Sequence, residues 1–499
     1  MNLAEKLIIS RPLYISDSDD PKCGYCKGQK DNDNKFATEG WRDLHKDDLD
    51  TIKFQSTTVG FHTELITAEM YDKLCNLGYR RSGNFIYKTD MLRNCCRLYT
   101  IRTNKTYLKM SKELKMCLRK FKKNITSAEF KPKSHYSDWV EELCDYQSNS
   151  STFKTVFEPA LFSEEKFQLY VKYQESIHHD EGNTRDQFES FLCNSPFSEE
   201  EIMGTSEEWE QLNNWFNLKS DDVILRNGPV HECYYHNGKL IAVAVLDFFP
   251  SGISSVYFIW DPDYSKWSLG KVSALREIAI LSKINRPYYY LGYYIEDCPK
   301  MNYKAKYGGE ILDVCNNKYI PLSKVSPMLK NGELFVGTNQ PTGALRQEID
   351  TLSTEKVNFE ENFHNAADEI YGPNGVAFET SNQSAQLLKR YGLNYDVTKT
   401  RDIYIHNDNN DKTDPHSRSR IHRFPNFVPG LVPLTEILEY FENGTIREVN
   451  RNTMIFDTRF HSIRVLKDLE LENSDTKTAI CDVIRLIGLN NTKNAIVII

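Results

Sequence analysis

The pattern of apolar residues predicts a mixed α/β fold for the middle of this chain. Residues 240–249 (LIAVAVLDFF) form a continuous apolar run typical of a buried strand, and residues 254–260 (SSVYFIW) predict a second strand. Between residues 268 and 284, apolar side chains recur at helical spacing at Leu269, Val272, Leu275 and Ala279. A third strand is predicted at 288–295 (YYYLGYYI). Strand, strand, helix, strand is the order of an acetyltransferase-type core.

The flanking segments divide the chain into an N-terminal Cys-rich domain with a basic helix (1–145), a polar linker (146–159) and a domain that carries the acetyltransferase-type core (160–499). From about residue 331 the apolar pattern of this domain is less regular. Residues 406–420 predict an exposed loop, and strand-like pieces lie at 453–456 and 495–499, with a helix near 476–486.

The stretch 105–134 is strongly basic, with only Glu113 and Glu129 opposing its cations. Met110, Leu114 and Leu118 recur at helical spacing, which predicts a basic amphipathic helix. Such a helix is either a solvated face or a track for RNA phosphates, and the charge imbalance favours RNA contact. The candidate RNA-binding residues are Lys109, Lys112, Lys115, Arg119, Lys122 and Lys123.

Composition narrows the class of protein. Of the 499 residues, 40% are hydrophobic and 26% are charged, which is ordinary for a globular protein with a real core, and a net charge of −8 argues against a generic nucleic-acid coat protein. The apolar run from Leu7 to Ile9 is too short for a signal peptide, and no stretch approaches the ~18 apolar residues of a membrane span. We therefore expect a cytoplasmic or nuclear protein without a membrane partner, whose 12 cysteines are thiols or metal ligands.

Four cysteines have the spacing of a shared metal site. Cys23 and Cys26 form a C-x-x-C motif whose thiolates can face one ion, and Cys95 and Cys96 offer a second pair. Four thiolates suit a zinc ion or an iron–sulfur cluster. The alternative is a turn plus two core cysteines; the second pair favours the shared site.

Two blocks of motifs resemble one family, the eukaryotic arginyl-tRNA–protein transferases. The N-terminal block comprises the C-x-x-C motif, residues 78–83 (GYRRSG) and residues 95–102 (CCRLYTIR). The second block comprises the segments 177–180 (IHHD), 191–196 (FLCNSP), 238–243 (GKLIAV), 254–257 (SSVY), 261–264 (DPDY), 268–270 (SLG), 273–277 (SALRE) and 298–304 (CPKMNYK). Arg97 and Asn302 depart from residues common in the family, and the region beyond about 330 resembles only fungal-type members.

The resemblance implies an aminoacyltransferase with a GNAT-like acyltransferase core, related in form to bacterial leucyl/phenylalanyl-tRNA–protein transferase. It implies arginyl-tRNA as co-substrate and acceptor proteins that begin with Asp, Glu or oxidised Cys. It also implies a place in the N-degron pathway, with ubiquitin ligase machinery downstream, and a zinc ion or iron–sulfur cluster on the four cysteines.

The residues are adequate to this chemistry. The donor is an activated ester and an α-amine has a pKa of about 8, so positioning and removal of one proton suffice. Candidates for the catalytic role are Asp261, Asp263, Tyr264 and Glu277. Carboxylates that can bind the arginyl guanidinium are, besides Asp261, Asp263 and Glu277, the residues Asp247, Glu296 and Asp297.

The acidic acceptor needs a cation, which Arg80 and Arg81 or Lys300 and Lys304 can supply. Simpler interpretations compete with several of these roles. The segment 261–263 also reads as a turn after a strand, and Arg276 and Glu277 as solvated helix charges.

Two rival functions remain. A CoA-dependent N-acetyltransferase shares the core order, but the start of its helix normally carries several glycines where this chain has only Gly270. A zinc-dependent adaptor that binds N-termini or RNA without catalysis would use the cysteines and the basic helix alone.

Overall fold

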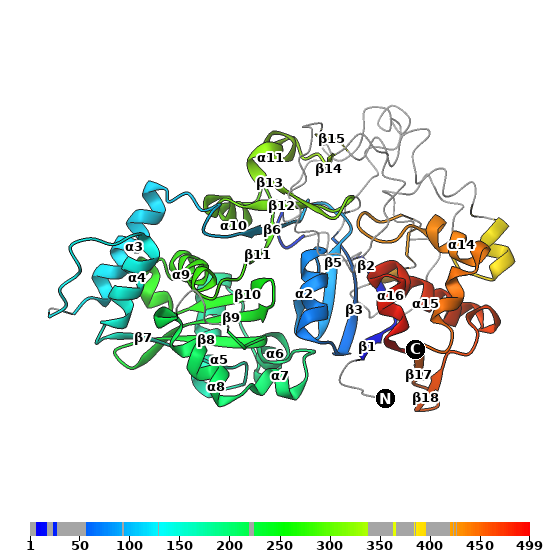
Figure 1. The fold of residues 1–499 in the computed structure, drawn as a ribbon, viewed down its shortest axis with the longest axis horizontal. Coiled ribbons are helices and arrows are strands. Elements are labelled where there is room, and N and C mark those ends of the chain that lie inside the picture. The colour runs from blue at the N-terminus through cyan, green and yellow to red at the C-terminus, as the bar shows by residue number, and fades with distance from the viewer. Residues whose placement is uncertain are drawn as a thin grey trace.

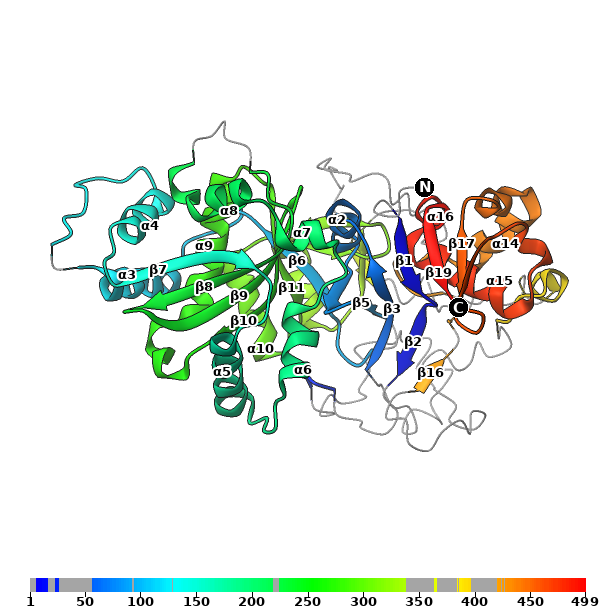
Figure 2. The same cartoon turned by 90° about the horizontal axis from the view of Figure 1, so that it is seen from below.

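The computed structural model describes residues 6–16, 23–26, 56–91, 94–127, 129–218, 224–337, 363–365, 384, 386–395, 420–422, 424–425 and 427–499. Within these residues the strands build two large sheets that lie side by side, plus the small pair β14 (Phe335–Gly337) and β15 (Phe363–Asn365) (Figures 1 and 2). A mixed α/β fold is thus confirmed.

The first sheet carries the predicted core. Its strand order is β13-β12-β6-β11-β10-β9-β8-β7. The strands are β6 (Tyr99–Thr103), β7 (Phe153–Pro159), β8 (Gly228–His236), β9 (Lys239–Phe249), β10 (Gly252–Trp260), β11 (Tyr288–Tyr294), β12 (Glu310–Asp313) and β13 (Lys318–Pro321). Together with helix α9 (Leu269–Lys283), the strands β9, β10 and β11 confirm the predicted order of strand, strand, helix, strand.

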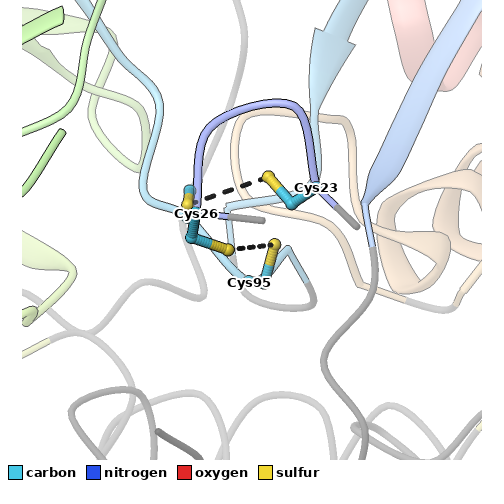
Figure 3. Close-up of side chains that lie close together, drawn as sticks. Cys23, Cys26 and Cys95 are labelled. Carbon is cyan, nitrogen blue, oxygen red and sulfur yellow. Dashed lines mark hydrogen bonds between the residues drawn. The ribbon is translucent and has the colours of Figure 1, made fainter. Parts of the chain in front are cut away.

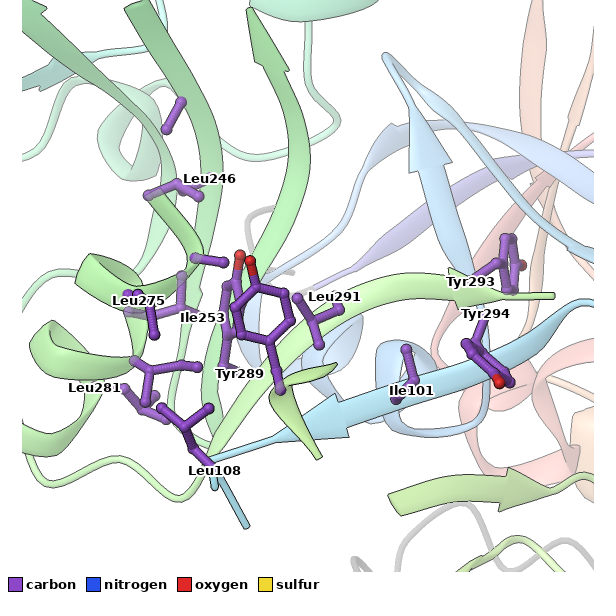
Figure 4. Packing of buried hydrophobic residues seen from close by; sticks show 14 of the residues in the cluster. Ile101, Leu108, Leu246, Ile253, Leu275, Leu281, Tyr289, Leu291, Tyr293 and Tyr294 are labelled. Atoms are coloured by element: carbon purple, nitrogen blue, oxygen red, sulfur yellow. The ribbon is translucent and has the colours of Figure 1, made fainter. Parts of the chain in front are cut away.

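Helices cover both faces of this sheet. Helices α3 (Lys112–Ile125), α4 (Trp139–Ser148) and α9 contribute to one apolar core with Ala244, Leu246 and Ile253 of the sheet. On the other face, Leu169 of α5 (Glu164–Tyr173) and Phe188 of α6 (Arg185–Phe188) pack with alternate residues of β9. Figure 4 shows the α9 side of the core, with Leu275 of α9 and Tyr289 of β11 among the packed side chains.

The first sheet has an opening where the parallel strands β10 and β11 separate after a short paired stretch. These strands pair only from Gly252 to Ser254 against Tyr288 to Tyr290. Beyond this point β10 has an irregularity in its pairing with β9, between Ser255 and Tyr257, and β11 continues along β6 instead. The middle of the sheet therefore contains a stretch of β10 without a partner strand on the β11 side.

Short helices and turns complete the layers around the first sheet. They are the π-helices η3 (Gln174–His178) and η4 (Glu189–Cys193), α7 (Glu199–Met203), α8 (Ser206–Asn213), η5 (Trp215–Asn217), η6 (Pro262–Trp267), α10 (Pro299–Asn302), η7 (Tyr303–Tyr307) and α11 (Leu322–Lys330). None of the helices in the described part of the chain is both long and apolar enough to cross a bilayer.

The second sheet joins segments from the two ends of the sequence. Its strands are β1 (Leu7–Ser10), β2 (Leu13–Ser16), β3 (Thr57–Leu65), β4 (Arg80–Ser82), β5 (Phe85–Thr89), β16 (Arg420–His422), β17 (Met454–Asp457), β18 (Ser462–Val465) and β19 (Ala495–Ile498). β1 pairs in parallel with β19, which in turn pairs with β17. Around it lie α2 (Ala68–Asn76), α14 (Leu434–Asn443), η10 (Thr445–Val449), η11 (Leu469–Leu471), α15 (Ser474–Ile487) and α16 (Leu489–Lys493).

The elements predicted from the sequence are present in the fold, but some of their limits differ. The predicted strands at 453–456 and 495–499 and the helix at 476–486 are β17, β19 and α15. The helix predicted within 105–134 is confined to α3, and the predicted linker 146–159 contains the end of α4 and strand β7. The predicted loop at 406–420 lies outside the described residues except for its last position. Because β6 belongs to the first sheet and β17–β19 to the second, the predicted division into domains cuts across both sheets and stays a prediction.

Candidate functional site

The four predicted cysteines come together in one cluster. The sulfur of Cys23 lies 3.9 Å from that of Cys96, and the sulfur of Cys26 lies 3.8 Å from that of Cys95 (Figure 3). All four sulfurs lie within 4.8 Å of one another. A zinc ion with four Zn–S bonds of ~2.3 Å requires sulfur–sulfur distances of roughly 3.8 Å. The donor set and its spacing therefore fit one tetrahedral ion.

The backbone around the cluster is held by an asparagine. The side chain of Asn94 accepts a hydrogen bond from the Thr57 amide (2.8 Å) and donates one to the Cys96 carbonyl (2.7 Å). Cys23, Cys95 and Cys96 are buried. The second cysteine pair is thus fixed to the start of β3.

Two buried cations lie near this cluster, beside the end of β11. Arg80 is 6% exposed; its Nη1 donates to the carbonyl of Cys75 (2.9 Å), and its guanidinium lies 5.7 and 5.6 Å from the ring centroids of Tyr290 and Tyr293. Its Nε and Nη2 atoms have no hydrogen-bond partner among the described residues. The Nζ of Lys304 donates to the Tyr293 carbonyl (2.6 Å), and burial together with nearby Arg80 lowers the pKa of Lys304 to about 7.

The loop of the C-x-x-C motif reaches the same place. Tyr25, inside that motif, is close enough to Tyr87 and Cys298 to interact electrostatically with both, and with Tyr293 of β11. The cysteine cluster, Arg80 and Lys304 therefore surround one end of the strand that flanks the opening in the first sheet.

Arg81 differs from its neighbour because it already has an internal partner. Its Nε and Nη2 donate to both carboxylate oxygens of Asp247, at 2.7 and 2.6 Å, and both side chains are almost fully buried. Neither of these two predicted substrate-binding residues is available to a ligand without breaking this ion pair. Lys300, on α10, is exposed and lies close enough to His178 to lower the pKa of that imidazole, alongside the larger effect of burial.

Glu277 lies inside a polar network on the inner face of α9. It is 1% exposed and accepts hydrogen bonds from the hydroxyls of Ser273 and Tyr289. Burial raises the pKa of Glu277 to about 7, although these two hydrogen bonds oppose the change. The neighbouring Arg276 is 0% exposed and pairs with Glu232 at 2.8 Å. The interpretation of Arg276 and Glu277 as solvated charges is therefore wrong, because helical spacing did not reveal that α9 buries its polar positions as well.

The other catalytic candidates lie at the end of β10 and are tied to cations or to a histidine. The carboxylate of Asp261 binds the Nζ atoms of Lys172 and Lys239, each at 2.6 Å, and these hydrogen bonds lower its pKa against the opposing effect of burial. Asp263 binds the same Lys172. The Tyr264 hydroxyl lies 3.0 Å from Nδ1 of His236.

A pocket of about 290 Å³ opens where α9 begins. It is lined by Trp260, Ser265, Tyr303 and the first residues of α9, up to Lys271. Tyr303 lies near enough to Glu277 for the carboxylate to raise its pKa, after the larger effect of burial. The pocket therefore adjoins the buried acid.

Glu296 and Asp297 lie elsewhere, in a small hollow after β11. Arg97 and Tyr99 line the same hollow, and the hydroxyl of Tyr294 donates to Glu296. The predicted binding of the arginyl guanidinium by these carboxylates stays a prediction.

The predicted tRNA-binding cations are divided between an exposed and a buried set. Lys109 precedes α3 and is exposed, as are the α3 residues Lys112, Lys115, Arg119 and Lys123. Lys122 is buried, pairs with Glu142 and lies over the ring of Tyr146. α3 is connected to the pocket through its own Glu113, which binds Lys271 at 2.5 Å.

Sequence reasoning missed Ser273 and Tyr289 as members of the polar network. Ser273 was noted only within the motif 273–277, and Tyr289 only as part of an apolar strand. The spacing of Ser273 and Glu277 could have revealed their contact, because residues four apart are neighbours on a helix.

The chain is similar in sequence to known proteins along most of its length. Residues 21–116 match the family model for the arginine-tRNA-protein transferase N terminus, and residues 165–313 match the model for its C terminus. An arginyl-tRNA–protein transferase 1 from Saccharomyces cerevisiae is 47% identical over 487 residues, which cover 96% of this chain and 95% of that protein.

More distant relatives match mainly part of the chain. A Drosophila melanogaster arginyl-tRNA–protein transferase 1 is 38% identical over 168 residues, covering 32% of this chain and 31% of its own. An aspartate/glutamate leucyltransferase from Polynucleobacter asymbioticus is 30% identical over 259 residues, covering 51% of this chain and 82% of its own. Since the yeast match extends over nearly the whole of both proteins, the chain belongs to the arginyl-tRNA–protein transferase family, and it is an aminoacyltransferase.

Proposed function

We propose that this enzyme transfers arginine from arginyl-tRNA to the N-terminal α-amine of proteins that begin with Asp, Glu or oxidised Cys. The arginine then marks these proteins, in the cytoplasm and nucleus, for ubiquitin-dependent degradation. The observation that carries the choice of acceptor is the pair of buried cations, Arg80 and Lys304, beside the end of β11. A buried cation without a carboxylate partner is costly, and an acidic side chain from the acceptor relieves that cost.

A GNAT-like core suits this reaction. Its support is the order of β9, β10, α9 and β11 and the separation of the two parallel strands after Ser254 and Tyr290. Donor and acceptor can then meet from opposite sides of the opening. The pocket at the start of α9 adjoins Glu277 through Tyr303 and suits the arginylated 3′ end of the tRNA.

The tRNA body would lie along the exposed cations of α3. This role belongs to Lys109, Lys112, Lys115, Arg119 and Lys123, since Lys122 already pairs with Glu142. Support comes from the short connection between α3 and the pocket, made by Glu113 and Lys271. Phosphate contacts of this kind carry affinity rather than sequence recognition.

The four cysteines would hold a single zinc ion rather than an iron–sulfur cluster. A cluster places irons and sulfides between its ligands and so separates the cysteine sulfurs further than one ion does, whereas these sulfurs lie within 4.8 Å of one another. The ion would supply structural cross-linking: it would hold the loop that carries Tyr25 against the strand β11.

Glu277 is the group we assign to proton removal. Asp261 and Asp263 are engaged by Lys172, whereas burial raises the pKa of Glu277 to about 7, close to neutral pH. A general base with a pKa near the working pH is the efficient one.

The test of this function uses labelled arginine, tRNA, arginyl-tRNA synthetase and peptides that begin with Asp or with Ala. Label should enter the Asp peptide only when tRNA is present. Transfer from acetyl-CoA would support an acetyltransferase instead, and tight binding of the Asp peptide without transfer would support a non-catalytic adaptor.

A matched pair of variants tests whether Lys304 recognises the acidic side chain of the acceptor. Lys304→Met should raise the KM for the Asp peptide and reduce the preference for Asp over Ala. Lys88→Met is the control, because Lys88 is also buried and also donates one hydrogen bond to a backbone carbonyl, that of Gly430 at 2.7 Å. Equal effects of the two substitutions would assign Lys304 a role in folding only.

A further inference from the structure

The buried position of Glu277 raises a question about how it could reach a substrate. The side chain is 1% exposed, and the two hydroxyls that donate to it, those of Ser273 and Tyr289, belong to residues that are 3% and 2% exposed. A base must lie within hydrogen-bonding reach of the proton that it removes, either directly or through an intermediate group. An amine in the opening of the sheet therefore needs a connection to this carboxylate.

The connection runs through one tyrosine and one serine. The hydroxyl of Tyr289 donates to Oε2 of Glu277. Ser255 follows Ile253, the partner of Tyr289 in the sheet, by two residues, so it lies on the same face of β10. Its hydroxyl is near enough to that of Tyr289 to oppose the rise in the pKa of Tyr289 that burial causes. The three groups come from three elements, α9, β11 and β10. They form a row of neighbouring groups, from Ser255 through Tyr289 to Glu277.

The outer end of this chain lies where the sheet opens. Ser255 is the first residue of β10 after the last pair with β11, and it sits at the irregularity in the pairing of β10 with β9. Residues 255–258 are half-buried, whereas Gly252, Ile253 and Ser254 are buried. The Ser255 hydroxyl therefore stands between the enclosed network and the opening into which we place the acceptor.

The charged neighbours of Glu277 are one acid, Glu232, and one base, Arg276. From β8 it is faced by Glu232, whose own partner is Arg276 of α9. Tyr234 donates to Glu232, and Tyr303 of η7 lies on the side of the pocket. No lysine of the described residues pairs with Glu277, so its charge is set by burial and by this network.

We propose that Ser255 and Tyr289 relay the proton of the acceptor amine to Glu277 during arginine transfer. This inference rests on the proposed function and extends it. The amine nitrogen attacks the ester carbonyl carbon of arginyl-tRNA, a C–N bond forms, and the C–O bond to the terminal ribose breaks. The nitrogen gives its proton to the Ser255 oxygen, Ser255 gives one to Tyr289, and Tyr289 gives one to Glu277. The chain then runs in reverse to protonate the departing ribose oxygen, so the enzyme ends in its starting state.

Tyr289→Phe is the direct test, because it removes one link and keeps the ring that packs against the core. We expect the single-turnover rate, measured with preloaded arginyl-tRNA and saturating Asp peptide, to fall by about 10²-fold or more. Binding of arginyl-tRNA should be unchanged. Tyr79→Phe is the matched control, since Tyr79 is also fully buried and its hydroxyl makes one backbone hydrogen bond, to Leu486 at 2.7 Å.

The pH profile separates a relay from a packing role. In the wild type two groups must lose a proton, Glu277 and the α-amine, so log rate should rise with a slope of about two at acid pH. In Tyr289→Phe only the amine remains, and the slope should fall to about one. Ser255→Ala should lower the rate and the slope in the same sense.

Three outcomes are distinguishable. A wild type that transfers no arginine contradicts the proposed function itself. A wild type that transfers arginine, with a Tyr289→Phe variant of unchanged rate and slope, overturns the relay alone. A variant that is slower but keeps the wild-type slope also overturns it, because the hydroxyl then acts only through packing. Near-ultraviolet circular dichroism on both Tyr variants shows that a slow enzyme is a folded one.

Discussion

Replacing Glu277 by Gln should change how the stability of the enzyme depends on pH. The carboxyl is fully buried, and burial raises its pKa from an ordinary 4.5 to about 7. Between these values the unfolded chain releases the proton while the folded protein retains it. Stability linked to this group is therefore complete below pH 4.5 and is lost as the pH rises toward 7.

The size of the effect follows from the two pKa values. Each pH unit of the difference corresponds to about 1.4 kcal/mol, so the wild type should lose about 3 kcal/mol from this group across the window. Gln does not titrate, and the variant loses none of that contribution. Other groups titrate in both proteins, so the difference between the two isolates Glu277.

Urea unfolding from pH 4.5 to 8 measures this difference. Trp215, Trp260 and Trp267 belong to the same half of the molecule and provide a fluorescence signal for it. The unfolding free energy of the variant, relative to the wild type, should rise by about 3 kcal/mol as the pH increases. Parallel curves for the two proteins would refute the reasoning, since they would mean that Glu277 has the same pKa in the folded and unfolded states.

Three further predictions concern the metal, the buried ion pair and the tRNA. Cys95→Ser should remove most of the bound zinc, as measured by atomic emission, and full zinc content in the variant would contradict a four-cysteine site. Asp247→Asn should reduce the unfolding free energy in urea by about 3–5 kcal/mol, because it leaves a buried guanidinium unpaired; the matched substitution Asp263→Asn, at a carboxylate that is 67% exposed, should cost under about 1 kcal/mol, and equal losses would argue against this reason. Replacing Lys115 and Arg119 by Gln should weaken tRNA binding and lower the slope of log affinity against log salt by about one for each lost phosphate contact, and an unchanged slope would place the tRNA elsewhere.

The parts of the fold that were predictable are those that depend on local pattern. The continuous apolar run of β9 and the helical spacing of α9 are properties of neighbouring residues, and both elements appear within a residue or two of the predicted limits. The same holds for α15 and β19 near the other end of the sequence. The cysteine cluster was also predictable, because metal binding restricts the residue types and the spacing of at least one ligand pair.

The parts that were not predictable depend on contacts between distant segments. Arg81 and Asp247 each looked like a substrate-binding residue, and only their pairing across the two sheets shows that they neutralise each other. The burial of Glu277 depends on Glu232 and Tyr289, which lie on strands that flank α9 in space. The limits of α3 were overestimated because the lysines continue beyond the helix, and charge alone does not specify where a helix ends.

The parallel pairing of β1 with β19 has a consequence for how the enzyme is made. β19 lies between β1 and β17, so the second sheet lacks an inner strand until residues 495–498 have been synthesised. The ribosome delivers β1 long before β19, and the first strand waits for this partner while the intervening chain is synthesised. The first sheet contains strands from residues 99 to 321 only and can assemble while synthesis continues. A chain that lacks residues 495–498 would therefore keep all strands of the first sheet but lose the strand between β1 and β17 in the sheet that carries Arg80 and Arg81.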